Sequence, residues 1–166
     1  TTFHDAYCSQ EEIEVYRALL KNNKLPLRLY TIIKATKPNL QYFLPQGPKI
    51  GLGNHHLTIR AIKLTADGAL GSRGAALIQD YTDEPGTKGL LMLSQKQIYE
   101  LSMLALKHNF QVATHAIGDK TNRVVINAYE QAFKDYFNGK IEKGKNVRFR
   151  IEHAQILTKQ DIPRFA

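Results

Sequence analysis

The fold is decided by the stretch Leu57-Thr58-Ile59-Arg60-Ala61-Ile62-Lys63-Leu64-Thr65. Apolar and polar side chains alternate along most of it, which predicts a β-strand over residues 57–65. One face of this strand would carry Leu57, Ile59, Ala61 and Lys63. The residues that follow, from 66 to 93, are rich in glycine and predict a long loop.

On both sides of this stretch the sequence alternates between strand and helix patterns. Helix starts are indicated where a Ser or Thr stands three residues before an acidic residue or Gln. Asp119 is a candidate N-cap for a further helix, which would end at Asn138-Gly139. Residues 34–56 contain several prolines and glycines, and predict a long loop with room for one helical turn. The further strands are predicted over Thr1–Asp5, Leu27–Ile33, Phe110–His115 and Val147–His153. The helix-start pairs are Ser9 with Glu12, Ser94 with Gln97, and Thr158 with Asp161.

Five strands, each followed by a connection long enough for a crossover, predict parallel strands with helices outside. Two α/β architectures fit this order: a doubly wound sheet, and part of a (β/α)8 TIM barrel, which needs about 250 residues in full. A strand at residue 1 and a helix that is cut at Ala166 favour the partial barrel. We therefore expect residues 1–166 to be the central part of one barrel domain, truncated at both ends.

Composition excludes several classes of protein. The chain has 166 residues, 43% of them hydrophobic, and no apolar run long enough to cross a bilayer. Its formal net charge is +8, but the basic residues are scattered, so we expect neither a nucleic-acid nor a membrane partner. The single cysteine, Cys8, forms no disulfide within the chain and is interpreted as a small apolar residue. The compartment is left open.

The residues that close three successive strands are the candidates for chemistry: Lys63, His115 and His153. In parallel α/β folds such positions share the edge where ligands bind. Taken singly, a lysine there is usually a solvated charge, and a histidine is usually a hydrogen-bonded structural residue. Together they have the composition of a metal site. Neutral imidazoles are good zinc ligands, and a buried lysine, whose charged form is disfavoured, can react with carbon dioxide to form a metal-binding carbamate.

Three segments resemble the amidohydrolase family 3 proteins, which include N-substituted formamide deformylase-like enzymes. The first is Ile62-Lys63-Leu64-Thr65-Ala66-Asp67-Gly68-Ala69-Leu70-Gly71-Ser72-Arg73-Gly74-Ala75-Ala76-Leu77. The others are Ala113-Thr114-His115-Ala116-Ile117-Gly118-Asp119 and Arg150-Ile151-Glu152-His153-Ala154-Gln155. The three occur in the family's order and spacing, and the resemblance spans nearly the whole chain.

The resemblance implies about strands 2 to 6 of a barrel with a one- or two-metal centre, typically zinc. Lys63, carboxylated when it bridges two metals, and His115 and His153 would be metal ligands. Asp67, Arg73 and Asp119 would lie on the substrate side or brace the ligands, and a purely structural role is equally open. The family's HxH pair and its general-base aspartate are not in this sequence, so they are expected outside it. The histidines that match no ligand position are His4, His55, His56 and His108.

The resemblance further implies a hydrolase for non-peptide carbon–nitrogen bonds, of the amide or formamide type, that uses a metal-activated water. We expect the 166-residue chain alone to be inactive and to self-associate through open sheet edges. The other hypothesis is a non-catalytic binding module on the same scaffold, with a basic surface. The sequence specifies neither the substrate nor the identity of the metal.

Overall fold

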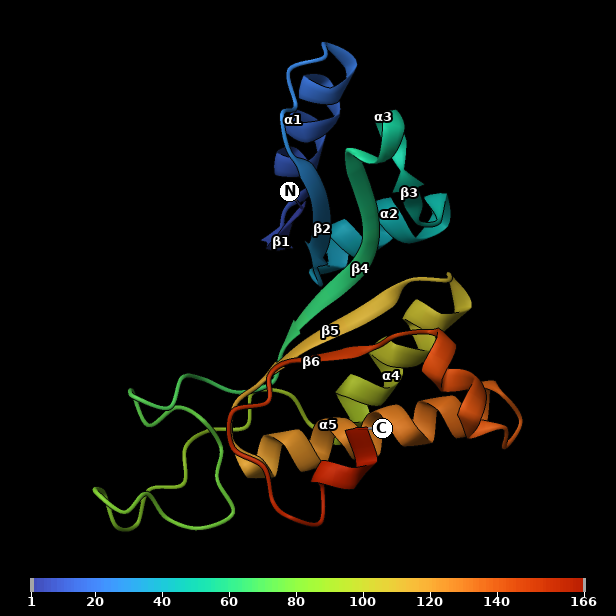
Figure 1. Cartoon of the computed structure of the whole chain (residues 1–166). Coiled ribbons are helices and arrows are strands. Elements are labelled where there is room, and N and C mark those ends of the chain that lie inside the picture. Colours follow the sequence, from blue (N-terminus) through green and yellow to red (C-terminus); the bar gives the residue numbers. More distant parts are fainter. Residues whose placement is uncertain (1, 166) are drawn as a thin grey trace. The chain divides into compact units, whose positions relative to one another are not determined.

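The computed structural model describes residues 2–165, which form two compact units (Figure 1). The first unit comprises residues 2–63 and 105–113, and the second comprises residues 64–104 and 114–165. The boundary falls within two strands and one helix, between residues 63 and 64, 104 and 105, and 113 and 114. The strands follow the order β1-β2-β4-β5-β6, and the short β3 pairs with β4. Thr1 and Ala166, the two ends of the predicted elements, lie outside the described residues.

The first unit is built on parallel strands. β1 (Thr2–Cys8) pairs in parallel with β2 (Arg28–Lys34), and β2 pairs in parallel with β4 (Leu57–Thr65). The predicted bounds of β4 are those observed. The core of the first unit includes the buried side chains Ile32, Ala61 and Ala113, with Tyr30 packed against them. Parallel strands buried in this way are typical of sheets covered by crossover helices.

Helix α1 (Gln10–Lys21) begins where the sequence predicts. The Ser9 hydroxyl accepts a hydrogen bond from the backbone N–H of Glu12 (3.3 Å), and the Glu12 carboxylate accepts one from the N–H of Ser9 (2.7 Å). This reciprocal capping box satisfies two donors that the first turn of a helix leaves without partners. Ile13 on its inner face is fully buried.

The prediction of a long loop over residues 34–56 was wrong. This segment contains α2 (Lys37–Phe43), a 3₁₀ helix (Leu44–Gln46), β3 (Lys49–Gly51) and α3 (Leu52–His55). Its prolines do not interrupt these helices, because both α2 and the 3₁₀ helix carry a proline in the first turn. A proline there removes no intrahelical hydrogen bond, since the first N–H groups have no partner within the helix.

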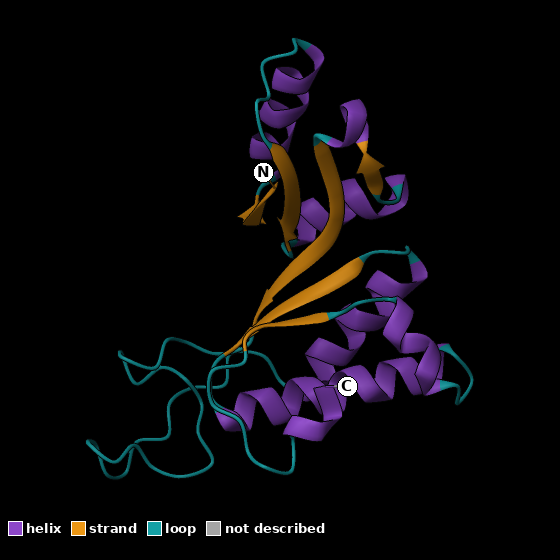
Figure 2. Cartoon of the chain, viewed as in Figure 1, coloured by secondary structure: helices purple, strands orange, loops and turns teal. Residues whose placement is uncertain are grey.

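The second unit combines a long loop with two helices and the ends of the strands. Residues 66–93 contain no helix or strand longer than an isolated bridge, as predicted (Figure 2). The remaining elements are α4 (Gln95–Lys107), β5 (Gln111–Ala116), α5 (Asp119–Tyr136), β6 (Arg150–His153) and two 3₁₀ helices (Ile141–Asn146 and Ile162–Phe165). Ser94 and Gln97 form the predicted capping contacts at the start of α4.

Three predictions in this unit need correction. Strand β6 begins at Arg150 and not at Val147, because Val147 is the C-cap of the preceding 3₁₀ helix and Arg148 has a φ of 58°. The N-cap of α5 is Gly118, and Asp119 is the first helical residue. The helix start predicted at Thr158 exists, but the helix it precedes is of the 3₁₀ type.

The long loop is a packed part of the second unit. A Cβ placed on Gly118 would lie 1.9 Å from the carbonyl oxygen of Ala76, and one placed on Gly89 would lie 2.0 Å from that of Ala75. Two glycines therefore allow the backbone at 75–76 to pass closely between them. Among the described helices, none is both long enough and apolar enough to span a membrane.

Candidate metal site

His115 and His153 lie side by side in the second unit. His115 is the second-last residue of β5 and His153 the last residue of β6, and these strands are neighbours in the sheet. The two imidazole rings contact each other edge to face, with 4.6 Å between their centroids. The sequence therefore predicted correctly that two of its candidate residues meet at one sheet edge.

The backbone at the end of β6 is strained. His153 has a φ of 75° and Ala154 a φ of 42°, in the left-handed region that L residues other than glycine seldom adopt. Such strain persists only where surrounding contacts hold it, and it is often found at functional sites. Here the contacts are hydrogen bonds from the N–H of Ala154 to Ala116 (3.1 Å) and from the N–H of Ile156 to Ile117 (3.0 Å).

Asp67 is fully buried and faces His115. Its Oδ1 lies 3.4 Å from Nε2 of His115. The same carboxylate accepts backbone hydrogen bonds from Ala76, Ile117 and Gly118, at 3.1, 3.0 and 2.9 Å. A buried charge needs such partners to offset its desolvation. Asp67 thus connects the loop that follows β4 to the loop that follows β5.

The other two residues predicted beside the site have structural partners. Arg73, in the long loop, pairs with Asp83 at 3.0 Å, and this carboxylate raises the pKa of the guanidinium. Asp119 accepts hydrogen bonds from the N–H of Ile78 (2.9 Å) and from the N–H of Lys120 (2.8 Å). These contacts are compatible with a bracing role, and a role of either residue on the substrate side stays a prediction.

Lys63 belongs to the first unit, where it is buried at 8% exposure and is in register with Lys34 of β2. Its role as a ligand stays a prediction. Of the histidines that match no ligand position, His4 stacks on Tyr30 with 4.7 Å between ring centroids, and His56 contacts the carbonyl of Gly53. These contacts agree with structural roles.

Cys8 is buried, and its thiol donates a hydrogen bond to the carbonyl of Asp5. Burial, reinforced by the charge of Asp5, raises the pKa of this thiol to about 12. A thiol with such a pKa carries almost no thiolate at neutral pH. Its interpretation as a small apolar residue agrees with this environment.

The histidine pair fits a divalent metal in kind. Two imidazoles on adjacent strand ends, one of them facing a buried carboxylate, have the arrangement in which a second residue orients a metal-binding histidine. Within residues 2–165, however, no three His, Cys, Asp or Glu side chains are grouped so as to hold an ion. In the described part of the chain the histidine pair therefore gives two candidate ligands, whereas a zinc site needs three or four.

Asn122 lies near the histidine pair and was not predicted from the sequence. It is fully buried in the first turn of α5, and its Nδ2 contacts four backbone carbonyls. The available signal was weak: asparagine favours helix ends over interiors because its side chain bonds to nearby backbone.

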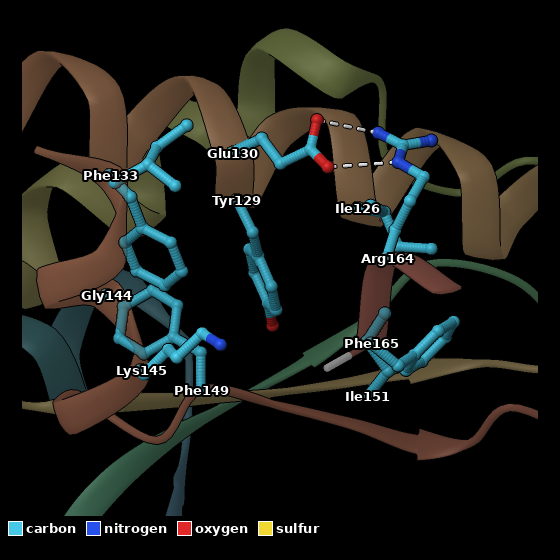
Figure 3. A pocket seen from close by; sticks show the side chains of 11 residues that line it. Ile126, Tyr129, Glu130, Phe133, Gly144, Lys145, Phe149, Ile151, Arg164 and Phe165 are labelled. Carbon is cyan, nitrogen blue, oxygen red and sulfur yellow. Dashed lines mark hydrogen bonds and ion pairs between the residues drawn. The ribbon is translucent and has the colours of Figure 1, made fainter. Parts of the chain in front are cut away.

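The second unit also contains a pocket of about 510 Å3 between α5, β6 and the 3₁₀ helices (Figure 3). Aromatic rings of Tyr129, Phe133 and Phe149 form one wall, with Phe149 5.1 Å from each of the other two. At its rim, Arg164 binds both carboxylate oxygens of Glu130, at 2.8 and 2.9 Å. None of the predicted site residues lines this pocket.

Comparison with known proteins connects the chain to a family. The model of the amidohydrolase family matches residues 1–166. The chain is 38% identical over 109 residues to "Protein LONG AFTER FAR-RED 3" from Arabidopsis thaliana, covering 66% of this chain and 18% of that protein. It is 31% identical over 157 residues to "Putative amidohydrolase YtcJ" from Bacillus subtilis, covering 93% of this chain and 26% of that protein.

Among solved structures, an uncharacterized metal-dependent hydrolase from Pyrococcus furiosus matches with a TM-score of 0.80 and 28% identity. The match covers 98% of this chain and 31% of that one. The chain thus spans less than a third of each of these relatives. The parallel strands with alternating helices, together with this likeness, confirm the predicted partial TIM barrel of the metal-dependent hydrolase type. The chain belongs to the amidohydrolase family.

Proposed function

We propose that this chain supplies His115 and His153 as two ligands of a zinc site in a hydrolase for amide-type, non-peptide carbon–nitrogen bonds. The observation that carries the proposal is the contact of the two rings at adjacent strand ends, at 4.6 Å between centroids. Family membership and the metal-dependent hydrolase with a similar structure support a metal-dependent hydrolase in general. Zinc and the class of bond are part of the proposal.

The histidines would bind the ion through neutral imidazole nitrogens. A divalent metal of this kind, when bound, polarises a carbonyl and lowers the pKa of water. Within this chain, the buried Asp67 carboxylate holds the backbone that follows His115 and faces its ring. We assign proton transfer to no residue of this chain, because the general base is expected outside it.

Lys63 is proposed as a further ligand in its carboxylated form. The support is its burial two residues before the end of β4 and the resemblance of residues 62–77 to the family's segment. Mass spectrometry of tryptic peptides does not preserve carbamates, so the test is ¹³C NMR of protein equilibrated with ¹³C-bicarbonate. A carbamate signal that disappears in Lys63→Ala and persists in Lys49→Ala is expected, and its absence from the wild type would refute this part.

The main test is zinc binding and hydrolysis in a longer protein that contains this chain. Wild type, His115→Ala and His153→Ala would be purified without chelator, analysed for metal, and assayed on a panel of N-formyl and N-acyl amines. We expect zinc in the wild type and a loss of zinc and activity in both variants. His108→Ala is the matched control, because His108 lies on no strand end and matches no ligand position.

A wild-type protein that takes up no metal after zinc loading would overturn the proposal and favour the binding module with a basic surface. Zinc bound without hydrolysis of any panel compound would refute the proposed bond class and retain the metal site. Self-association through the sheet edges stays a prediction, which sedimentation of this chain at several concentrations would test.

A further inference from the structure

The segment Ala116–Gly118 directly follows His115 and is held from both sides by buried polar side chains. On its N–H side, the Asp67 carboxylate accepts from Ile117 (3.0 Å) and Gly118 (2.9 Å). On its carbonyl side, Asn122 donates to the oxygens of this segment. Both side chains are 0% exposed, so neither set of bonds competes with water.

The amide of Asn122 connects the two histidine strands. Its Nδ2 lies 2.9, 3.2 and 3.4 Å from the carbonyl oxygens of Gly118, Ile117 and Ala116. The same nitrogen lies 3.1 Å from the carbonyl oxygen of Ile156, three residues after His153. One side chain therefore ties the backbone that follows β5 to the backbone that follows β6.

The orientation of this amide is determined by its surroundings. Four carbonyl oxygens surround Nδ2, and Oδ1 has no hydrogen-bond partner in the described part of the chain. A rotation of the amide by half a turn would place an acceptor among four acceptors.

The backbone at the end of β6 is strained, and the hydrogen bonds around it keep it in that conformation. His153 and Ala154 both have positive φ values, and Ala154 and Ile156 each donate to the segment that follows His115. Without the bond to Ile156, the chain after His153 would lose one of the contacts that hold this backbone in place. The ring of His153 would then be free to leave the ring of His115.

We infer that Asp67 and Asn122 are positioning residues that act as a pair to set the distance between the His115 and His153 rings. This inference rests on the proposed function for its purpose, but the geometry that it describes does not depend on a metal. Asp67 acts on the N–H groups of Ile117 and Gly118 and on the ring of His115. Asn122 acts on the carbonyl groups and on the loop after His153.

The decisive experiment is metal-free NMR of this chain with ¹³C-labelled histidine. In the wild type we expect nuclear Overhauser contacts between ring protons of His115 and His153, because the rings touch. In Asn122→Ala and in Asp67→Asn these contacts should be lost while the far-UV circular dichroism is retained. Asp67→Asn preserves the shape but turns one acceptor into a donor that faces N–H groups.

Val125→Ala is the matched control. Val125 is also fully buried on α5 and its truncation destabilises the helix, but it makes none of the bonds to Ala116–Gly118. Ring contacts that survive in Asn122→Ala and Asp67→Asn would overturn the inference. Ring contacts that are lost equally in Val125→Ala would also overturn it, since the effect would then be general destabilisation.

Should both variants fail to fold, amide hydrogen exchange of the wild type decides the question. The N–H groups of Ile117 and Gly118 should exchange at least tenfold more slowly than the N–H of Gly86, whose partner Asp80 is exposed. Equal exchange rates would refute the role of Asp67 as the buried acceptor that holds these two N–H groups.

A zinc titration of the longer protein that contains this chain separates this inference from the proposed function. Competition with a chromophoric chelator should show that Asn122→Ala and Asp67→Asn weaken Zn2+ binding about 10- to 100-fold, whereas Val125→Ala leaves it unchanged. If the wild type keeps its ring contacts but binds no zinc, the proposed function fails and the positioning pair stands. If zinc binds equally to all variants while the contacts are lost, positioning has no role in metal binding.

Discussion

Gly118→Ala should destabilise the second unit more than any ordinary surface substitution. The added Cβ would lie 1.9 Å from the carbonyl oxygen of Ala76, 2.5 Å from its carbonyl carbon and 2.8 Å from its nitrogen. All three are backbone atoms, so no side-chain rotation relieves the overlap. Ordinary van der Waals contact begins at 3.4 Å, so the two backbone segments would have to separate by about 1.5 Å.

That separation would break bonds that meet at this point. The N–H groups of Ala76 and Gly118 both donate to Oδ2 of Asp67, at 3.1 and 2.9 Å. Leaving a buried polar group without its partner costs about 1 to 3 kcal/mol, so the loss of both bonds with partial relaxation predicts about 3 kcal/mol. At a urea dependence of about 2 kcal/mol per molar, the unfolding midpoint should fall by about 1.5 M.

The assay is urea unfolding of this chain, followed by far-UV circular dichroism and by tyrosine fluorescence, since the chain contains no tryptophan. Gly71→Ala is the matched control within the long loop, because a Cβ there would meet nothing within 4 Å and its φ is not positive. It should change stability by less than about 0.5 kcal/mol. Equal midpoints for the two variants would refute the close approach of Gly118 and Ala76.

Three further substitutions or treatments test the local chemistry. Ser9→Ala should destabilise the chain by about 1 kcal/mol through loss of the α1 cap, and Ser9→Thr should restore most of it; an unchanged melting temperature in Ser9→Ala would contradict the cap. Cys8, whose pKa is raised by burial to about 12, should react with iodoacetamide at pH 8 only after urea unfolding, and rapid labelling of the native chain would be inconsistent with this. Burial alone would raise the pKa of Asp161, but hydrogen bonds from Thr158 and from two arginines outweigh it and lower the pKa. Its stabilising effect should therefore be complete above the ordinary aspartate pKa of about 4 and be lost as the pH falls through the lowered value. The cost of Asp161→Asn, measured by urea unfolding, should accordingly be larger at pH 7 than at pH 2.5, and a cost that does not vary with pH would count against it.

Much of the fold could be predicted because the relevant signals are local. The alternation over Leu57–Thr65 and the capping box of Ser9 and Glu12 each depend on residues only a few positions apart. The elements within residues 34–56 were missed because their formation does not depend on local signals alone. A proline is read as a break unless its position within a helix is known, and that position depends on the surrounding packing.

In the candidate site, too, the residues at strand ends could be predicted and the contacts between distant segments could not. His115 and His153 could be paired from the sequence, because parallel strands bring their C-terminal ends to one edge whatever the intervening residues are. Asp67 was recognised only as a residue near that edge. Its bonds to Ile117 and Gly118 join positions 50 and 51 residues apart, and no periodicity reports such a contact.

The sequence by itself determined the order of strands and helices, the partial barrel and the two histidines at its edge, since short-range patterns and chain direction specify these. Only the tertiary structure decided that Arg73 pairs with Asp83, that Asp119 accepts from the N–H of Ile78, and that Asn122 joins the backbone after β5 to the backbone after β6. The physical reason is that a buried polar side chain must find its partners wherever folding brings them, and for Asn122 and Ile156 these positions are 34 residues apart.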